Sequence, residues 1–320
     1  MLVRFWGTRG SLPVALKADA VVRKLTRALL AADGRKFADE DEARAFIATL
    51  DFPTRATYGG ASSCVEIEGG DGSFIVCDMG SGLREFGLSA AGRTARGERP
   101  KIYNIFMSHL HWDHIMGFPF FGQAFDPGVK IVFHGGHADI EKALRRQQEE
   151  ISFPVPFDWL RADISFNTLT PGERYRIGGC DVSLIKQRHS NDSYGYRFED
   201  ESGAVVYSTD SEHKADDMEA ETAFEAFFRD ADLVIFDTMY SLADSVTMKA
   251  DWGHSSNIVA VDMCLRAGVR KLALFHHEPI YRDVEIQQVL DETIRYEELT
   301  REDRPALGVI CAYDGLEVAI

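Results

Sequence analysis

The segment from Ser108 to His114 constrains this chain more than any other stretch of its sequence. It reads Ser-His-Leu-His-Trp-Asp-His, and it directly follows an apolar, strand-like run from Lys101 to Met107. The whole chain has 10 histidines in 320 residues, so this cluster is rare by chance. A loop that leaves a strand end can turn several side chains toward one point, which a helix face cannot do. The pattern therefore predicts a metal site rather than a surface cluster of histidines.

Imidazole nitrogens and a carboxylate suit Zn²⁺, Mn²⁺ or Fe²⁺ better than Ca²⁺ or Mg²⁺. Three further residues stand at or just past the ends of strand-like runs, where open α/β folds tend to place their sites. They are His189, Asp210 and His276. Each of them alone is as easily structural as metal-binding, because an acid at a strand end often caps the next turn. Together with the cluster, their number fits a site for two cations.

Short strand-like runs and longer amphipathic runs alternate along the chain. Ser63 to Glu68 and Phe74 to Met79 flank a Gly-Gly-Asp-Gly turn, which predicts a hairpin. Three neighbouring strands are expected between 182 and 208, and a last hairpin around Asp314-Gly315. No low-complexity linker divides the chain. We therefore expect one compact α/β domain over residues 1–320, with sheets covered by helices.

A helical insertion at about 15–50 interrupts the early strands. Val21, Val22, Leu25, Ala28 and Leu29 recur at helical spacing, and a second helix is expected from Ala43 to Leu50. The apolar stripe of the first helix must bury against its own domain, against the site as a lid, or against a partner subunit. We favour a lid or a homodimer contact.

The charge balance limits the partners that the chain can have. Its 35 basic and 51 acidic residues give a net charge of −16, whereas phosphate-dominated binding of a long nucleic acid needs a basic face. No apolar run is long enough to cross a membrane. The 5 cysteines are scattered and odd in number, so a disulfide framework or a cysteine zinc site is not expected. A reducing cytoplasm is the expected location.

The chain resembles the metallo-β-lactamase-fold hydrolase superfamily, and within it the branch that includes ribonuclease Z and related phosphodiesterases. The segments that carry the likeness are Phe5-Trp6-Gly7-Thr8-Arg9-Gly10-Ser11, Tyr58-Gly59-Gly60, Asp78-Met79-Gly80-Ser81-Gly82, His109 to His114, His189, Tyr194-Gly195-Tyr196-Arg197, Ser208-Thr209-Asp210, Gly253-His254-Ser255 and Leu274-Phe275-His276-His277. This resemblance implies an αββα four-layer sandwich, with two metal ions at one edge between the sheets.

The resemblance also implies a set of metal ligands. The residues implied are His109, His111 and His189 for one metal, Asp113, His114 and His276 for the second, and Asp210 as the bridge between them. His277 competes with His276 as the last ligand, and we prefer His276 because it directly follows the apolar strand.

Two side chains are candidates for a catalytic role. His254 resembles the histidine that assists departure of the leaving group in ribonuclease Z-like enzymes; alternatively it only precedes a helix that Ser255 or Ser256 caps. Asp113 could orient the nucleophile as well as bind metal. Arg9, in the first loop, could meet a substrate phosphate or form a salt bridge.

The expected function is a dinuclear metal-dependent hydrolase, with Zn²⁺ favoured over Mn²⁺ or Fe²⁺. Its substrate would be a small phosphodiester such as a cyclic nucleotide, attacked by a hydroxide shared between the metals. A hydrolase of lactones, thioesters or other esters is the alternative, favoured by a tyrosine such as Tyr240 or Tyr281 near the carbonyl. A non-catalytic metal-binding signalling module is the second alternative. The sequence has no Gly- and Lys-rich arm for transfer RNA, and two bound cations would make the cleft attractive to a small anion.

Overall fold

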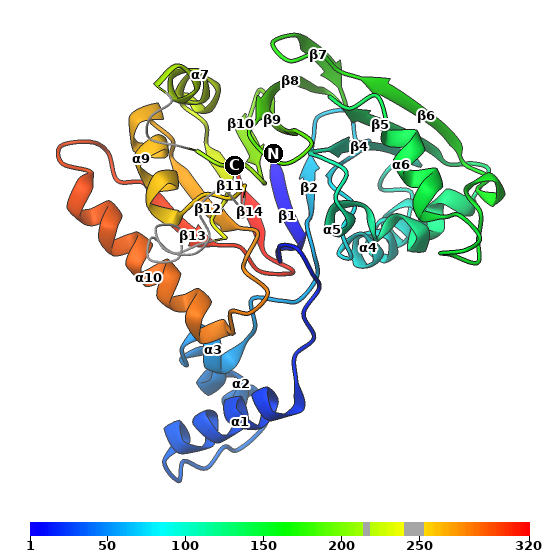
Figure 1. Ribbon diagram of the computed structural model, residues 1–320. Helices are drawn as coiled ribbons and strands as arrows, with labels where there is room; N and C mark the ends of the chain where they lie inside the picture. Colours follow the sequence, from blue (N-terminus) through cyan, green and yellow to red (C-terminus); the bar gives the residue numbers. More distant parts are fainter. Residues whose placement is uncertain (214–217, 240–252) are drawn as a thin grey trace.

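Two sheets packed face to face form the centre of the molecule (Figure 1). The computed structural model describes residues 1–213, 218–239 and 253–320, and in this part of the chain each sheet has seven strands. In spatial order the first sheet contains β14 (Glu317–Ala319), β1 (Leu2–Gly7), β2 (Cys64–Glu68), β3 (Phe74–Cys77), β4 (Ile102–Met107), β5 (Lys130–Gly135) and β6 (Asp163–Thr168). The second contains β13 (Gly308–Cys311), β12 (Lys271–Phe275), β11 (Leu233–Asp237), β10 (Gly203–Ser208), β9 (Ser193–Asp200), β8 (Cys180–Gln187) and β7 (Arg174–Ile177).

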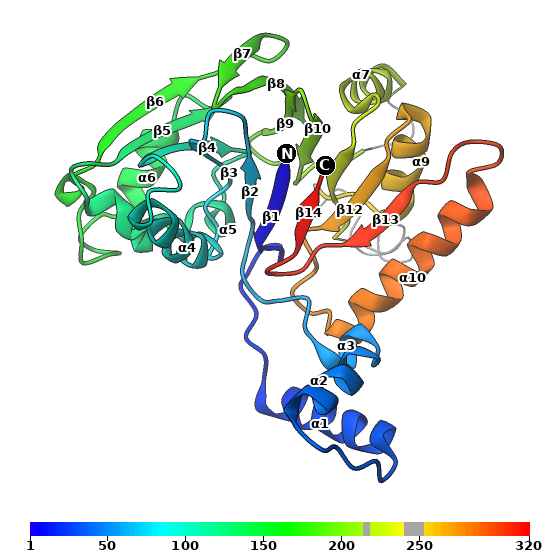
Figure 2. The same ribbon diagram turned by 180° about the vertical axis from the view of Figure 1, so that it is seen from behind.

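Helices cover the outer face of each sheet, as the two opposite views in Figures 1 and 2 show. The first sheet carries α4 (Leu83–Ala95), α5 (Trp112–Ile115) and α6 (Ile140–Gln147), with the short helices η1 (Phe118–Phe120), η2 (Gly122–Phe125) and η3 (Phe157–Trp159). The second carries α7 (Met218–Phe228), α9 (Asn257–Ala267) and α10 (Asp283–Thr300). This αββα arrangement confirms the fold class expected from the sequence.

The hydrophobic core has three layers, one between the sheets and one under each set of helices. Strand β1 shows why the chain folds this way, because its residues alternate between partly exposed and buried positions. Successive side chains of a strand point to opposite faces, so Val3 and Phe5 both enter the layer between the sheets. There they meet residues of the other sheet, such as Tyr207 and Phe275.

Parallel strands bring several aspartates and histidines to one edge of the sandwich. Strands β3 and β4 are parallel neighbours in the first sheet, and β10, β11 and β12 are parallel neighbours in the second. Because parallel strands end on the same side, the residues that follow them gather there. These residues are Asp78, His109, Asp210, Asp237 and His276.

The hairpin expected around Asp314-Gly315 is wrong. Strand β13 pairs with β12 in the second sheet, whereas β14 pairs with β1 in the first, so the chain crosses between the sheets at this turn. The Asp314 carboxylate accepts hydrogen bonds from the main-chain N–H groups of Gly60 and Ala61 and from the Thr8 hydroxyl. The turn is thus held by loops distant in sequence, which a local turn signal does not report. The hairpin expected between β2 and β3 is confirmed.

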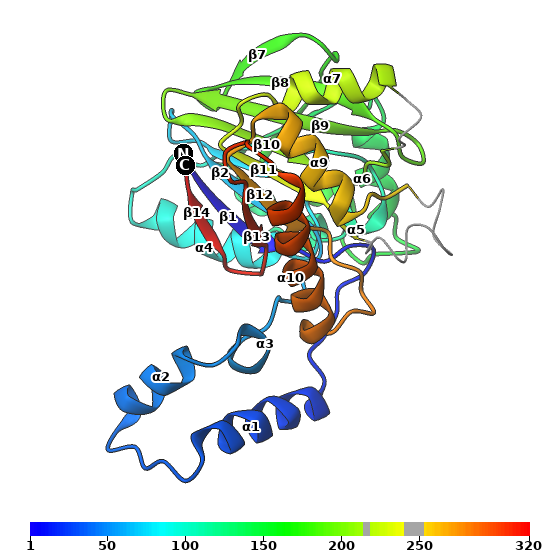
Figure 3. The ribbon, with the colours of Figure 1, turned by 90° about the vertical axis from the view of Figure 1, so that its left-hand side faces the viewer.

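The insertion forms the predicted helices, α1 (Ala18–Ala32) and α2 (Glu40–Ala48), followed by the short α3 (Phe52–Arg55). They project from the sandwich beside the start of α10 (Figure 3). No residue of α1 or α2 is buried, and Leu25 and Leu29 are 58% and 73% exposed. Lys24 ties the insertion to the body through an ion pair with Asp283, at 2.5 Å. The roles expected for the insertion, a lid or a homodimer contact, and the single-domain organisation stay predictions.

Among the described residues, none of the helices combines the length and the apolar character that a membrane crossing requires.

Candidate metal centre

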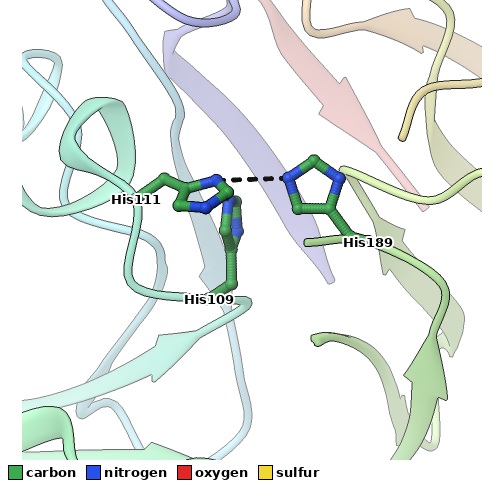
Figure 4. A group of neighbouring side chains, drawn as sticks. All are labelled: His109, His111 and His189. Atoms are coloured by element: carbon green, nitrogen blue, oxygen red, sulfur yellow. Dashed lines mark hydrogen bonds between the residues drawn. The ribbon is translucent and has the colours of Figure 1, made fainter. Parts of the chain in front are cut away.

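Three histidines from two strand ends form the first cluster of the site. His109 and His111 lie in the loop after β4, and His189 follows β8 (Figure 4). The Nε2 atom of His109 lies 2.9 Å from His111 Nδ1, and His189 Nε2 lies 3.2 Å from the same atom. A group of three imidazole nitrogens this close together matches the donor set that Zn²⁺ takes in proteins.

Asp113, His114 and His276 form the second cluster, and all three side chains are buried. The Asp113 Oδ2 atom lies 3.2 Å from His114 Nε2 and 3.4 Å from His276 Nε2. Helix α5 places Asp113 and His114, while the end of β12 places His276. The two clusters therefore draw on both sheets of the sandwich.

Asp210 lies between the clusters and turns one carboxylate oxygen toward each. Its Oδ2 atom lies 3.6 Å from the Nε2 atoms of both His109 and His189. Its Oδ1 atom lies 3.3 Å from the Nε2 atoms of His114 and His276. All seven residues that the resemblance implied as ligands are thus brought to one place, in the arrangement expected of two clusters sharing a carboxylate.

Neighbouring groups fix the orientation of several histidine rings. His114 Nδ1 lies 2.7 Å from Asp78 Oδ2, and His189 Nδ1 lies 2.9 Å from the carbonyl oxygen of Gly253. In each ring this contact engages Nδ1 and leaves Nε2 facing the centre. Asp78 itself is fully buried and also accepts hydrogen bonds from Ser108 and Tyr207.

Asp78 was not predicted to take part in the site, although it belongs to the segment Asp78-Met79-Gly80-Ser81-Gly82 that resembles the family. The same omission applies to Asp237, the last residue of β11, whose Oδ2 atom lies 2.8 Å from His254 Nδ1. Both are acids at the ends of apolar strands, which is the signal that identified Asp210. Asp237 also lies 3.9 Å from His276 Nδ1, so one carboxylate contacts two histidines of the site.

His254 lies at the side of the second cluster, in a group with Asp210 and His276. It also precedes α9, as the helix-end alternative expects: Ser256 is the N-cap residue, and its hydroxyl accepts a hydrogen bond from the Val259 N–H. Burial would lower the pKa of His254, but the carboxylate of Asp237 raises it to about 9. His254 therefore lies both before the helix and against the second cluster, and its catalytic role stays a prediction.

The surroundings of the centre shift the pKa values of its histidines and carboxylates. Burial and the neighbouring His114 hold the pKa of His109 well below its usual range, which keeps its ring neutral. Burial alone would raise the pKa of Asp210, but His276 and His114 hold it well below its usual range. Burial alone would lower the pKa of His114 as well, but Asp113, Asp210 and Asp78 raise it well above its usual range. A cation at the second cluster would therefore have to displace a proton from His114, because imidazole binds metal ions in its neutral form.

Backbone geometry at this edge is specialised. Asp78, Asp210 and His276 all have positive φ, at 61°, 50° and 62°. Non-glycine residues seldom adopt this left-handed conformation, and it clusters at functional sites. Gly10 lies directly against His276, and a Cβ atom at Gly10 would fall 2.5 Å from the Nδ1 atom of that ring. The first loop thus needs a glycine where it passes the second cluster.

Other candidates lie away from the clusters. His277 is turned toward the core, where its ring nitrogen Nε2 lies 2.8 Å from the carbonyl oxygen of Ala312. Arg9, for which the sequence left a substrate phosphate and a salt bridge as alternatives, donates to the carbonyl oxygens of Gly59, Glu278 and Tyr281. The Tyr281 side chain packs against the core layer under α9 and α10. Tyr240 lies outside the described residues.

Comparison with known proteins identifies the family. Residues 74–277, more than half of the chain, match the model of the family described as the β-lactamase superfamily domain. The chain therefore belongs to this superfamily, a family of metal-dependent hydrolases with the metallo-β-lactamase fold. This confirms the resemblance and the enzyme class that the sequence predicted.

The individual relatives are more distant. Ribonuclease Z of Oceanobacillus iheyensis is 22% identical over 242 residues, which cover 60% of this chain and 76% of that protein. Ribonuclease Z of Staphylococcus saprophyticus is 29% identical over 106 residues, 31% of this chain and about a third (32%) of the length of that relative.

Solved structures agree with the fold. The metallo-β-lactamase fold protein YhfI from Bacillus subtilis superposes with a TM-score of 0.61 at 18% identity, covering 99% of this chain and 98% of the other. A diphosphatase from the PhnP family gives a TM-score of 0.61 at 18% identity, covering 99% and 96%.

Proposed function

We propose that this chain is a dinuclear metal-dependent phosphodiesterase that acts on a small phosphodiester. The position of Asp210 is the observation that carries the proposal. Its two oxygens face two separate groups of imidazoles, as a ligand shared by two cations would. Sites with two cations a few ångströms apart are typical of enzymes that cleave phosphate esters.

The residues present fit such a pair of cations. His109, His111, His189 and Asp210 would hold one of them, and Asp113, His114, His276 and Asp210 the other. The Nε2 atoms of His114 and His276 are buried without a hydrogen-bond partner in the described part of the chain, which is costly unless a cation engages them. When bound, the two cations would neutralise the phosphate and acidify water for the attack. Donors rich in imidazole favour Zn²⁺, with Mn²⁺ and Fe²⁺ as alternatives.

His254 would protonate the leaving oxygen. Asp237 accepts from its Nδ1 atom, which holds the ring in one orientation and stabilises its protonated form. His254 is grouped with Asp210 and His276, so a proton on its ring would lie close to the second cluster. Asp113, which is shared between His114 and His276, would also orient the attacking water.

The substrate is proposed to be small. The net charge of −16 disfavours a long nucleic acid, although the relatives named above are ribonucleases. A cyclic nucleotide offers one phosphodiester without the long anionic backbone, so it is the first substrate to test. The likeness to ribonuclease Z supports the phosphodiester, because that is the bond such enzymes cleave.

The test combines metal analysis with three sets of substrates. Protein loaded with Zn²⁺ or Mn²⁺ is assayed on bis-p-nitrophenyl phosphate, on 2′,3′- and 3′,5′-cyclic nucleotides, and on lactones and thioesters. We expect about two metal ions per chain and turnover of at least one phosphodiester. Cleavage of lactones or thioesters but of no phosphodiester would show the proposal to be wrong and would favour the ester alternative. Full metal occupancy with no turnover of either class would favour the non-catalytic alternative.

A further inference from the structure

Helix α1 exposes its large apolar side chains and directs basic side chains toward the body of the protein, the reverse of an ordinary surface helix. Amphipathic helices usually direct their apolar stripe toward the body of the protein. The residues of α1 that line a cavity against the body are Asp19, Ala20, Arg23, Lys24 and Arg27, three of them basic. The large apolar residues of the helix, including Leu25 and Leu29, lie outside this lining and are exposed. The basic face of the helix is therefore the inward one.

The inward face of α1 closes a large cavity. The cavity has a volume of about 750 Å³ and lies between α1, the loops at 14–17 and 57–60, and the segment 279–284 that leads into α10. This volume is within the range of small-molecule sites, roughly 300–1,000 Å³. Val14, Leu16, Pro279 and Ile280 give it an apolar wall. A ligand with an organic body could rest against that wall.

The charges that line the cavity oppose the charge of the chain. Six basic side chains line it against two acidic ones, Asp19 and Asp283, so the cavity has four surplus positive charges in a chain of net charge −16. The basic side chains are those of Arg9, Lys17, Arg23, Lys24, Arg27 and Arg282.

Several of these charges are already engaged, and two are free to bind a ligand. Lys24 pairs with Asp283 and Arg23 with Asp19, while Arg282 pairs with Glu285. Arg9 is buried and donates to main-chain carbonyl oxygens. Lys17 and Arg27 form no ion pair with any described residue, and both are exposed. Concentrated positive charge beside an apolar wall matches a molecule that joins a phosphate to an organic body.

We infer that this cavity binds a phosphorylated organic ligand of nucleotide size, at a site separate from the candidate metal centre. Lys17 and Arg27 contact the phosphate, and the wall around Leu16 and Ile280 contacts the organic body. None of the residues in the two metal clusters lines the cavity. Binding there does not rest on the proposed function, because it needs no metal ion.

Calorimetric titration with adenosine 5′-monophosphate tests the inference. The full-length protein is titrated in excess chelator, so that binding to metal ions at the centre makes no contribution. We expect one molecule bound per chain, and a Lys17→Glu/Arg27→Glu variant that binds at least about tenfold more weakly. The matched control is Lys36→Glu/Arg44→Glu, which changes the net charge equally on exposed residues of the insertion outside the cavity lining. Circular dichroism checks that both variants keep their helices.

Four results would overturn the inference. The first is no binding of adenosine 5′-monophosphate, and the second is equal weakening in both double variants, which would show a non-specific effect of net charge. The third is equally tight binding of adenosine, which would show that the phosphate is not recognised. A His109→Ala/His114→Ala variant that still binds the nucleotide would support a separate site, and loss of binding in it would place the ligand at the metal centre instead.

Discussion

His254 and Asp237 form a buried hydrogen-bonded pair beside the two metal clusters, with His254 Nδ1 2.8 Å from Asp237 Oδ2. The pair joins the loop before α9 to the end of β11. Asp237 is fully buried, and it contacts His276 as well. This carboxylate can therefore set the position of a proton donor relative to a residue of the second cluster.

The first prediction concerns this pair. His254→Ala removes the proposed proton donor, so phosphodiester turnover should fall by roughly 10²–10⁴-fold while metal content stays at its normal level. Asp237→Asn leaves the imidazole but removes the charge that raises the pKa of His254. The alkaline limb of the kcat profile should then move to lower pH, because the donor loses its proton earlier.

The control for this pair is Asp262→Asn, on α9, whose carboxylate accepts from Tyr296 away from the site. Its turnover and pH profile should match those of the unchanged protein. If His254→Ala turns over substrate at the normal rate, His254 has no part in the mechanism.

The second prediction concerns Asp78, which orients His114 through the 2.7 Å contact with Nδ1. Asp78→Asn keeps the size of the side chain but removes its charge. Metal affinity should fall by roughly 10–100-fold, as for other carboxylates that hold a ligating histidine. Competition with a metallochromic chelator measures the change. The control is Asp283→Asn, because Asp283 is also a buried acid and accepts hydrogen bonds from Thr57 and Tyr58. This variant should leave metal affinity unchanged. Equal losses of metal affinity in both variants would assign the effect of Asp78 to general destabilisation.

The sequence predicted those parts of the site that depend on short stretches of chain, and missed contacts between residues far apart in sequence. The residues of the clusters could be found because each stands at a strand end or within one short motif. The roles of Asp78 and Asp237 could not be predicted from the sequence. Their partners His114 and His254 lie 36 and 17 positions away, and only the pairing of the sheets brings them together. The sequence favoured His276 over His277 because it directly follows the strand. The structure separates the two: His276 lies against Asp113 and Asp210, whereas His277 lies against the carbonyl oxygen of Ala312.

The fold shows the same division between local and distant information. The glycine-rich turn between β2 and β3 and the helical periodicity in α1 are local signals, and both the hairpin and the helix form where the sequence predicts them. The pairing of β13 and β14 with different sheets depends on β12 and β1, far away in sequence. The apolar stripe of α1 is exposed in the single chain, so the lid or homodimer contact favoured from the sequence stays a prediction.

The third prediction concerns Gly10, where a Cβ atom would lie 2.5 Å from His276 Nδ1. Gly10→Ala must displace the imidazole or the loop, so the second cluster should lose affinity for its cation. We expect metal content to fall from about two ions toward about one per chain, with loss of turnover. Gly122→Ala is the control, because a Cβ atom there meets open space. Two tightly bound ions in Gly10→Ala would show that His276 does not hold a cation.

The fourth prediction concerns the stability of the protein at acid pH. His134, in β5, is buried, and its Nε2 atom lies 3.1 Å from Asn104 Oδ1. Burial lowers the pKa of His134 from 6.5 to about 4. The unfolded chain therefore binds a proton at this residue between pH 6.5 and 4, whereas the folded chain does not. The contribution of His134 to the free energy of unfolding is fully present above pH 6.5. It is lost as the pH falls, and the loss reaches about 3 kcal/mol at pH 4.

Urea unfolding at several pH values, in chelator so that metal binding does not contribute, measures this loss. His134→Gln removes the titrating group but keeps a polar side chain, so its free energy of unfolding should depend less steeply on pH than that of the unchanged protein. Asn167→Ala removes an amide that lies 3.5 Å from His134 Nδ1 but retains the titrating ring, so it should retain the steep dependence. If His134→Gln and the unchanged protein lose stability in parallel between pH 6.5 and 4, His134 is not the group that takes up the proton on unfolding, and another buried histidine must be responsible.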